Sequence, residues 1–594
     1  MKDIELPKGL GTNRQIEWNS DIAAEMLRLL DIPYISMNPG ASYRGFEDSL
    51  VNYLGNRAPQ MLLCLHEDHV VSIAHGYAKA TDRPMACVLH SNVGLMHGLM
   101  GLFNAWCDRV PMLVLGATGP IEPEKRRPWI DWIHTAKDQG AMLRNFTKWD
   151  DEPRSSAGIV EAFLRAMQIT TEAPRAPVYI CLDAGLQETA TEAVAIPDPK
   201  RYRAAKPPAA SPSEVKAIAS QIAQARKPIF LFGRGSRRQA DWDRRVALAE
   251  LVGASVMTAF HERAVFPTDH GLHIGAPVRH LRASTKEMMA AADVIVSFDW
   301  LDLNGLLQKI VSPTDTLPAK LVQVTLDSEL HNGWTMDYFG LPPADVRVKA
   351  DADVFVEQLL AELQIELKGA RRWDGKGRAP LDTLAYNEKS SEQIAPTDIE
   401  VALAEIRGDQ KFTLAHLPLV WSGAAYRFRE PLDYLGHDGG GGLSAGPGLT
   451  VGAALALKDS KRPVISVLGD GDFLQGATAL WTAAHYRIPA LFIVSNNRSN
   501  YNDEIHQNTV ATLRRRPREN AWIGQRISDP EVDLTAIARG QGVEGEGPVK
   551  TVPALLNAIR HGIEVVKQGR PYFIDAHVAR APLSESPPAG RIGR

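Results

Sequence analysis

The sequence is poor in several features, and each shortage excludes a class of protein. Its 594 residues include only four cysteines, Cys64, Cys87, Cys107 and Cys181, without metal-ligand spacing, so we expect free thiols rather than a disulfide framework. No apolar run has transmembrane length, and residues 1–18 lack the apolar centre of a signal peptide. The formal net charge of −4 gives no electrostatic basis for binding nucleic acid or an anionic membrane. These absences predict a cytoplasmic protein with small-molecule partners.

The chain has instead three blocks in which short apolar runs alternate with helical patterns. Such alternation predicts parallel sheets with helices on both faces, an α/β fold repeated three times. Two polar stretches separate the blocks: residues 193–214, which we expect to continue neither a helix nor a strand, and residues 367–396. The predicted units are an N-terminal domain, a central domain, a linker, a C-terminal domain and a flexible tail: 1–190, 191–366, 367–396, 397–580 and 581–594.

The apolar runs locate the expected strands. They are 34–37, 61–65, 85–90, 112–116 and 177–182 in the first block, 229–232, 254–258, 294–298 and 320–326 in the second, and 413–415, 464–468, 490–495 and 572–575 in the third.

The most informative segment is residues 464–508. One apolar run ends in Gly469-Asp470-Gly471, a helical segment follows, and a second apolar run ends in Asn496-Asn497. Parallel strands joined by a crossover helix end side by side, so the Asp470 carboxylate and the Asn497 amide should meet at one sheet edge. The glycines permit close approach of a ligand, and the following helix directs its N-terminus to the same place. Hard oxygen donors there suit Mg²⁺ clamped to a diphosphate.

This motif resembles the diphosphate-binding signature of thiamine diphosphate (ThDP) enzymes. The three-block layout is similar to that of the acetolactate synthase and benzoylformate decarboxylase superfamily, in which the first block binds the pyrimidine and the third the diphosphate. The resemblance implies a Rossmann-like or flavodoxin-like fold for each domain. It also implies that Asp470, Asn497 and the Ser499 carbonyl are Mg²⁺ ligands. Many relatives have Ser where this chain has Asp472, which we expect to cap the helix with its charge directed away from the diphosphate.

A carboxyl group that follows an apolar strand is a candidate for activating the cofactor. Glu67 lies between such a strand and a helix, in a segment similar to the one that carries the family glutamate. ThDP reacts through carbon 2 of its thiazolium ring when an acid holds a proton on its pyrimidine. A carboxyl shielded from water suits this task, because burial favours its protonated form. In the family this glutamate reaches the cofactor of another subunit, so we expect at least a homodimer, and a homotetramer by analogy.

The substrate side resembles benzoylformate decarboxylase most. Residues 88–92, VLHSN, place His90 after a strand, and we expect its pKa to lie near neutrality, allowing it to protonate or orient the substrate. His97 is expected to be structural. The turn Asn38-Pro39-Gly40 is similar to a family cofactor loop, but Ala41 stands where the family has a substrate-binding serine, and Ser42 would reach that place only with a shifted backbone.

Further cofactor and pocket residues follow from the resemblance in the third block. Gly442 and Leu443 match the family position whose bulky side chain forces ThDP into a bent shape. Asn502 and Asp503 are predicted to line the substrate pocket. The central block lacks the spaced glycines of a dinucleotide site, so we do not expect FAD there, although some acetolactate synthases hold it.

These residues predict a ThDP- and Mg²⁺-dependent carbon–carbon lyase acting on a 2-oxo acid. Non-oxidative decarboxylation with some carboligation is the first interpretation. An acetolactate synthase-like carboligase, an acyl-CoA lyase or decarboxylase of the same superfamily, and a catalytically inactive regulatory homologue are the alternatives.

Overall fold

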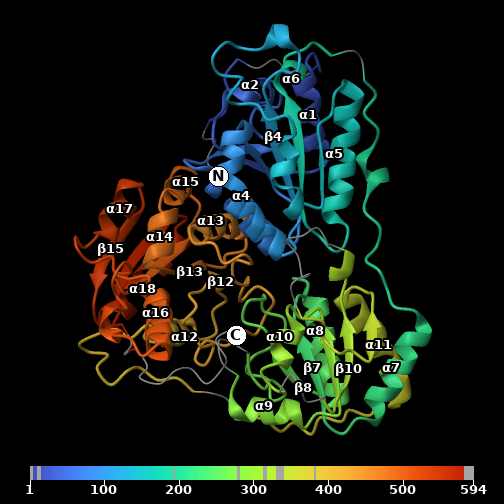
Figure 1. Cartoon of the computed structure of the whole chain (residues 1–594), viewed down its shortest axis with the longest axis vertical. Helices are drawn as coiled ribbons and strands as arrows, with labels where there is room; N and C mark the ends of the chain where they lie inside the picture. The colour runs from blue at the N-terminus through green and yellow to red at the C-terminus, as the bar shows by residue number, and fades with distance from the viewer. Residues whose placement is uncertain are drawn as a thin grey trace.

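The computed structural model describes residues 5–9, 15–191, 194–276, 281–311, 317–329, 340–379, 383–580 and 583. The chain forms three lobes, each built on a parallel sheet (Figure 1). Among the described residues no helix is both long and apolar enough to cross a membrane. Apart from Leu583, the predicted tail 581–594 lies outside the described residues.

The N-terminal sheet has six parallel strands in the order β2-β1-β3-β4-β6-β5. They are β1 (Tyr34–Met37), β2 (Gln60–Leu63), β3 (Ala86–Leu89), β4 (Met112–Thr118), β5 (Trp149–Asp151) and β6 (Pro177–Asp183). Its helices are α1 (Asn19–Leu29), α2 (Arg44–Asp48), α3 (Glu67–Thr81), α4 (Ser91–Cys107), α5 (Ser156–Thr171) and α6 (Ala184–Gln187). Every residue of β4 and β6 is buried, as expected where helices cover both faces of a parallel sheet.

The central sheet has five parallel strands in the order β11-β10-β9-β7-β8. They are β7 (Pro228–Phe232), β8 (Ser255–Thr258), β9 (Val294–Phe298), β10 (Lys320–Val324) and β11 (Val346–Val348). Its helices are α7 (Pro212–Gln224), α8 (Gln239–Val252), α9 (Ala283–Ala290), α10 (Leu303–Leu307) and α11 (Ala352–Glu366).

The C-terminal sheet has five parallel strands in the order β12-β13-β14-β16-β15. They are β12 (Thr413–His416), β13 (Val464–Gly469), β14 (Leu491–Asn496), β15 (Glu544–Val549) and β16 (Tyr572–His577). Its helices are α12 (Asp398–Arg407), α13 (Ala445–Leu457), α14 (Asp470–Gly476), α15 (Ala479–His485), α16 (Tyr501–Leu513), α17 (Leu534–Gly540) and α18 (Val552–Lys567).

The expected α/β class, with three parallel sheets, is confirmed. No α-helix or strand occupies the described residues 194–211 of the predicted boundary stretch. Ser211 and Glu214 form a capping box around Pro212, so α7 begins at the end of this stretch. Three strands, β5, β11 and β15, were missed. The last of these contains two glycines and a proline and has little strand propensity.

The N-terminal and C-terminal lobes share one apolar core, in which α3 packs against α13. Glycines allow the two helices to touch. A Cβ on Gly76 would lie 2.1 Å from the carbonyl oxygen of Leu449, and one on Gly452 would lie 1.9 Å from that of Ile73. The backbones could not come this close with larger residues. This packing sets the start of α3, where Glu67 lies, beside the loop that precedes α13.

Candidate functional site

The ends of β13 and β14 lie side by side, as their parallel register joins Gly469 to Ser495. Asp470 follows β13 directly and links the two strand ends. Its Oδ1 accepts the N–H of Gly471 at 2.9 Å, and its Oδ2 accepts the N–H of Ser499 at 3.0 Å. Burial raises the pKa of Asp470 to about 6, although these backbone donors oppose the rise. A cation beside this desolvated carboxylate would stabilise its charged form.

Asn497 provides a second oxygen at this edge. Its Oδ1 is buried and accepts no hydrogen bond from any described residue. An unsatisfied buried oxygen is costly, and a bound cation would relieve that cost. The donor types and the unpaired oxygen therefore fit Mg²⁺. The predicted third ligand, the Ser499 carbonyl, stays a prediction.

The glycines of this edge leave room for a ligand. A Cβ built on Gly469 would have no atom within 4 Å. A Cβ on Gly471 would lie 2.7 Å from Oδ1 of Asn500, so a larger residue would displace the Asn500 side chain.

Asp472 was expected to cap its own helix, and it does not. Its Oδ1 accepts the N–H of Ser444, the residue that precedes α13, at 2.8 Å. The carboxylate therefore fixes the start of α13. This loop also contacts the N-terminal lobe, since the hydroxyl of Ser444 donates to Asp68 Oδ2 at 2.7 Å.

Leu443 lies in the loop fixed by these contacts and is 50 % exposed. Its neighbour Gly442 packs on Met100 of α4, where a Cβ would lie 2.5 Å from the methionine methyl carbon. A half-exposed leucine held between two lobes has apolar surface available to a ligand.

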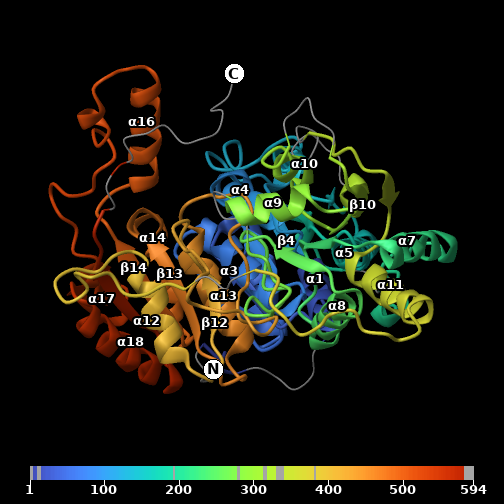
Figure 2. The same cartoon turned by 90° about the horizontal axis from the view of Figure 1, so that it is seen from below.

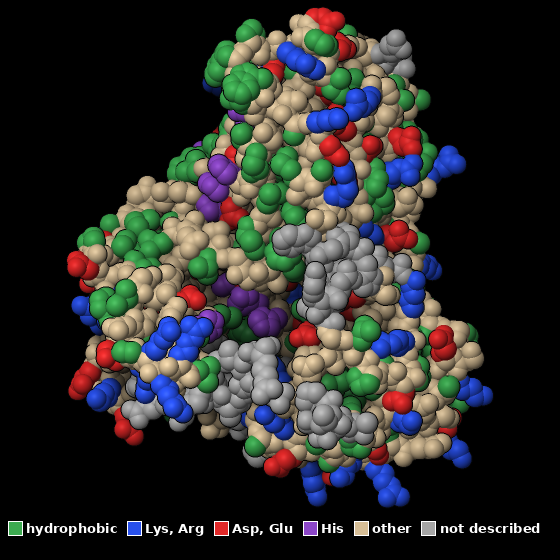
Figure 3. All heavy atoms as spheres, in the orientation of Figure 1, with side chains coloured by type: hydrophobic (Ala, Val, Ile, Leu, Met, Phe, Trp, Pro, Cys, Tyr) green, Lys and Arg blue, Asp and Glu red, His purple; other side chains and the backbone are tan. Residues whose placement is uncertain are grey.

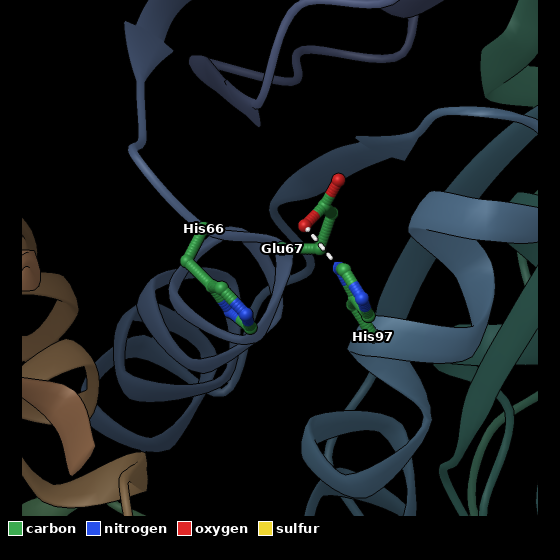
Figure 4. Close-up of side chains that lie close together, drawn as sticks. All are labelled: His66, Glu67 and His97. Carbon is green, nitrogen blue, oxygen red and sulfur yellow. Dashed lines mark hydrogen bonds and ion pairs between the residues drawn. The ribbon is translucent and has the colours of Figure 1, made fainter.

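Glu67 is the first residue of α3, and its side chain is 13 % exposed. Its Oε2 lies 3.1 Å from Nδ1 of His97, which comes from α4 (Figure 4). The ring of His66 stacks on that of His97, with ring centres 5.2 Å apart. We had expected a structural role for His97. Its direct contact with the candidate acid was missed because the pairing depends on how α3 and α4 pack.

His90 precedes α4, and its Nδ1 lies 2.8 Å from the Ser42 hydroxyl. Its ring meets that of His134 edge to face at 4.8 Å. Burial, followed by the neighbouring His134, lowers the pKa of His90 to about 4. The expectation of a pKa near neutrality was therefore wrong, because the sequence did not show that the ring is partly buried beside His134. At neutral pH the ring is uncharged.

The turn after β1 packs against the ring of His90. A Cβ on Gly40 would lie 2.3 Å from Cγ of His90, so the ring packs directly on the glycine backbone. The Tyr43 hydroxyl donates to the carbonyl oxygen of Asn38, which closes the turn around Pro39. The expected role of residues 38–40 in cofactor binding stays a prediction.

A cavity of about 270 Å³ opens next to this turn. It is lined by residues of the N-terminal lobe, three of them basic: Ala41, Arg44, Pro120, Lys125, Arg127, Ala184, Gly185 and Glu188. Ala41 therefore faces a space of small-molecule size. Asn502 and Asp503 lie elsewhere, on α16, which projects from the body of the chain (Figure 2), and the Asp503 side chain is 57 % exposed. Their predicted place in the pocket stays a prediction.

Three family models match the chain in the order of the three lobes. They are the N-terminal TPP binding domain, the central domain and the C-terminal TPP binding domain of thiamine pyrophosphate enzymes, over residues 18–142, 215–359 and 418–576. Together they span most of the chain.

Curated relatives match over nearly the full length. Benzoylformate decarboxylase of Pseudomonas aeruginosa is 26 % identical over 578 residues, which is 93 % of this chain and 97 % of the relative. A probable acetolactate synthase large subunit of Methanocaldococcus jannaschii is 23 % identical over 89 % of this chain and 88 % of its own.

Solved structures show the same fold. Benzoylformate decarboxylase from Polynucleobacter necessarius superposes with a TM-score of 0.77 at 21 % identity, covering 95 % of this chain and 100 % of its own. The thiamine diphosphate-dependent 4-hydroxybenzoylformate decarboxylase of Rhodococcus jostii has a TM-score of 0.76 at 22 % identity, covering 96 % and 100 %.

Proposed function

Because the chain belongs to the thiamine pyrophosphate enzymes, we propose that it binds ThDP with Mg²⁺ and decarboxylates a 2-oxo acid without oxidation, with some carboligation to a second carbonyl. The observation that carries the cofactor assignment is the unpaired buried Oδ1 of Asn497 at the same sheet edge as the desolvated Asp470. The unpaired amide oxygen of Asn497 and the desolvated charge of Asp470 support a bound cation.

Each residue of the site has a task in this proposal. Asp470 and Asn497 hold Mg²⁺ and through it a diphosphate. Leu443 supports the bent cofactor shape by its bulk. Glu67 holds a proton on the pyrimidine, within a homodimer in which it serves the neighbouring subunit. Bound ThDP supplies an electron sink at carbon 2 of its thiazolium ring, which the protein itself lacks.

On the substrate side, His90 acts as an uncharged imidazole. Its Nδ1 faces Ser42, which leaves Nε2 to orient a carbonyl or to pass a proton. The neighbouring cavity is lined by Arg44, Lys125 and Arg127, each of which is ion-paired with an acid of the chain. The carboxylate of a 2-oxo acid would replace one of these acids as the partner of a cation.

The reaction class rests on the relatives. Similarity to a curated benzoylformate decarboxylase, 26 % identical over 93 % of this chain, supports release of CO₂. A carboligase of the acetolactate synthase type is the second candidate, supported by a relative that matches 89 % of the chain. An acyl-CoA lyase is the third, and an inactive homologue the last.

Calorimetric titration of metal-stripped protein with ThDP, with and without Mg²⁺, tests the cofactor assignment. We expect Mg²⁺-dependent binding in the wild type and in Asp459→Ala, a control at an exposed aspartate of the same lobe, and loss of binding in Asp470→Ala. If the wild type binds no ThDP, the only remaining interpretation is that the protein is an inactive homologue.

The second step separates the reactions. The loaded enzyme is offered benzoylformate, other 2-oxo acids, pyruvate and acyl-CoA compounds, and CO₂ and products are measured. Aldehydes identify a decarboxylase, hydroxyketo acids a carboligase, and cleavage of acyl-CoA a lyase.

A further inference from the structure

Three buried residues outside the proposed ThDP and Mg²⁺ ligands converge on one point of the C-terminal lobe. His416 ends β12, and His437 and Asp438 lie in the segment that leads to Leu443. One donor atom from each, two imidazole nitrogens and a carboxylate oxygen, lies within 4.8 Å of the others. Histidine side chains gather in the hollow between the lobes (Figure 3).

Backbone pairing brings the three residues together. The N–H of Leu414 donates to the carbonyl of Asp433 at 2.9 Å, and the N–H of Leu435 donates to Leu414 at 3.0 Å. The segment before His437 therefore runs along β12. The N–H of His437 then donates to the carbonyl of His261 at 3.0 Å, and its own carbonyl accepts Lys79 Nζ. Contacts from all three lobes thus hold the position of His437.

The Asp438 carboxylate forms ion pairs with both imidazoles. Its Oδ1 is buried, contacts His437 Nδ1, and accepts no hydrogen bond of acceptable geometry. Nε2 of His416 lies 3.6 Å from the same oxygen, too far for a hydrogen bond. A Zn²⁺ ion with bonds of about 2.0–2.1 Å separates its tetrahedral ligand atoms by roughly 3.3 Å, close to the spacing of His416 and Asp438. His437 Nδ1 is in direct contact with the same oxygen and would move away from it to admit the ion.

His416 has the outer contact that is common among metal-binding histidines. Its Nδ1 faces the carbonyl oxygen of Val467 at 3.5 Å. If the proton of a neutral ring lies on Nδ1, Nε2 can bind an ion that Asp438 shares.

We propose that His416, His437 and Asp438 bind one divalent transition-metal ion of the Zn²⁺ type. Two imidazoles and one carboxylate select such ions over Mg²⁺, which prefers oxygen donors. With three protein ligands, the ion keeps a coordination position for water or another ligand. The ion would tie β12 to the loop that carries Leu443. It differs in place and chemistry from the Mg²⁺ proposed at Asp470 and Asn497.

Titration of tag-free, metal-stripped protein with Co²⁺ in the absence of ThDP tests this site. Four- or five-coordinate Co²⁺ with imidazole ligands absorbs visible light far more strongly than octahedral Co²⁺ with oxygen ligands. We expect one strongly absorbing Co²⁺ per chain, displaced by one equivalent of Zn²⁺, in the wild type and equally in Asp470→Ala. If Asp470→Ala still binds Co²⁺ in this way, the ion does not occupy the proposed cofactor site.

Conservative variants assign the ligands. His416→Gln and Asp438→Asn should weaken Co²⁺ binding by at least about 100-fold, the upper end of the loss seen on removing an outer-shell partner. His561→Ala, at an exposed histidine of α18, is the control and should bind as the wild type. Circular dichroism shows whether each variant is folded. A wild type without the strong absorption, or a folded His416→Gln that binds Co²⁺ as tightly as the wild type, would overturn the proposal.

Discussion

The Nδ1 atom of His97 lies 3.1 Å from Oε2 of Glu67, so the candidate acid of the site is held by a histidine from the neighbouring helix. His97 itself is 61 % exposed, and the exposed His66 ring stacks on it. The pair joins the start of α3 to the second turn of α4. If Glu67 acts on the cofactor, His97 is a positioning residue, because it acts through the carboxylate.

We expect His97→Ala to lower kcat for CO₂ release by up to about tenfold, since one hydrogen bond contributes about 0.5–1.5 kcal/mol. KM should change little, because His97 holds Glu67 rather than the substrate. His97→Asn, which keeps a donor near the position of Nδ1, should recover most of the rate. Steady-state kinetics with equal rates in wild type and His97→Ala would contradict the positioning role.

Glu67→Gln should separate cofactor binding from catalysis. The amide keeps the size of the side chain but cannot supply the acid, so kcat should fall by about 10²–10⁴-fold, the usual contribution of general acid–base catalysis. Binding of ThDP with Mg²⁺, measured by calorimetry, should remain because Asp470 and Asn497 are intact. A variant that keeps wild-type kcat would remove Glu67 from the mechanism.

Asp108 holds a buried charge cluster beneath α3. Its Oδ2 accepts Lys79 Nζ at 2.6 Å and lies 2.8 Å from Nε2 of His75. Asp108→Asn leaves the buried ammonium without a counter-charge, so we expect a loss of about 3–5 kcal/mol and a clear fall in Tm. Differential scanning calorimetry measures the change in Tm. Glu122→Gln, which removes a surface ion pair with Lys125, is the control and should leave Tm unchanged. Equal Tm values for the two variants would contradict the role of Asp108.

Glu262 should make stability depend on pH. Burial raises its pKa from 4.5 to about 7, with Arg234 opposing the rise. The folded chain therefore keeps a proton that the unfolded chain releases, and stability falls as pH rises from about 4.5 to 7. Glu262→Gln removes this cost, on the order of 3 kcal/mol by the pKa difference.

The Tm gain of Glu262→Gln over the wild type should therefore grow between pH 5 and 7 and stay constant from pH 7 to 8. Glu357→Gln, at an exposed glutamate, should show no such trend. A gain of the same size at pH 5 and pH 7.5 would show that the charge of Glu262 does not limit stability.

The sequence by itself determined that the chain has three parallel sheets. It also determined that Asp470 lies beside the end of β14, where its carboxylate accepts the N–H of Ser499. Apolar runs and crossover lengths are local properties, and parallel strands joined through helices must end at the same edge. It also placed Glu67 at the start of a helix after a strand. Strand β1 was predicted to the residue, whereas β15, with two glycines and a proline, had no local signal.

Only the tertiary structure decided what surrounds these residues. The low pKa of His90 follows from burial and from His134, which is 44 positions away in the sequence. The contact of His97 with Glu67 depends on the packing of two helices. The convergence of His416, His437 and Asp438 depends on a segment that pairs with β12 while contacts from the other lobes hold it. Such relationships arise from long-range packing and desolvation, which no local pattern of residues records.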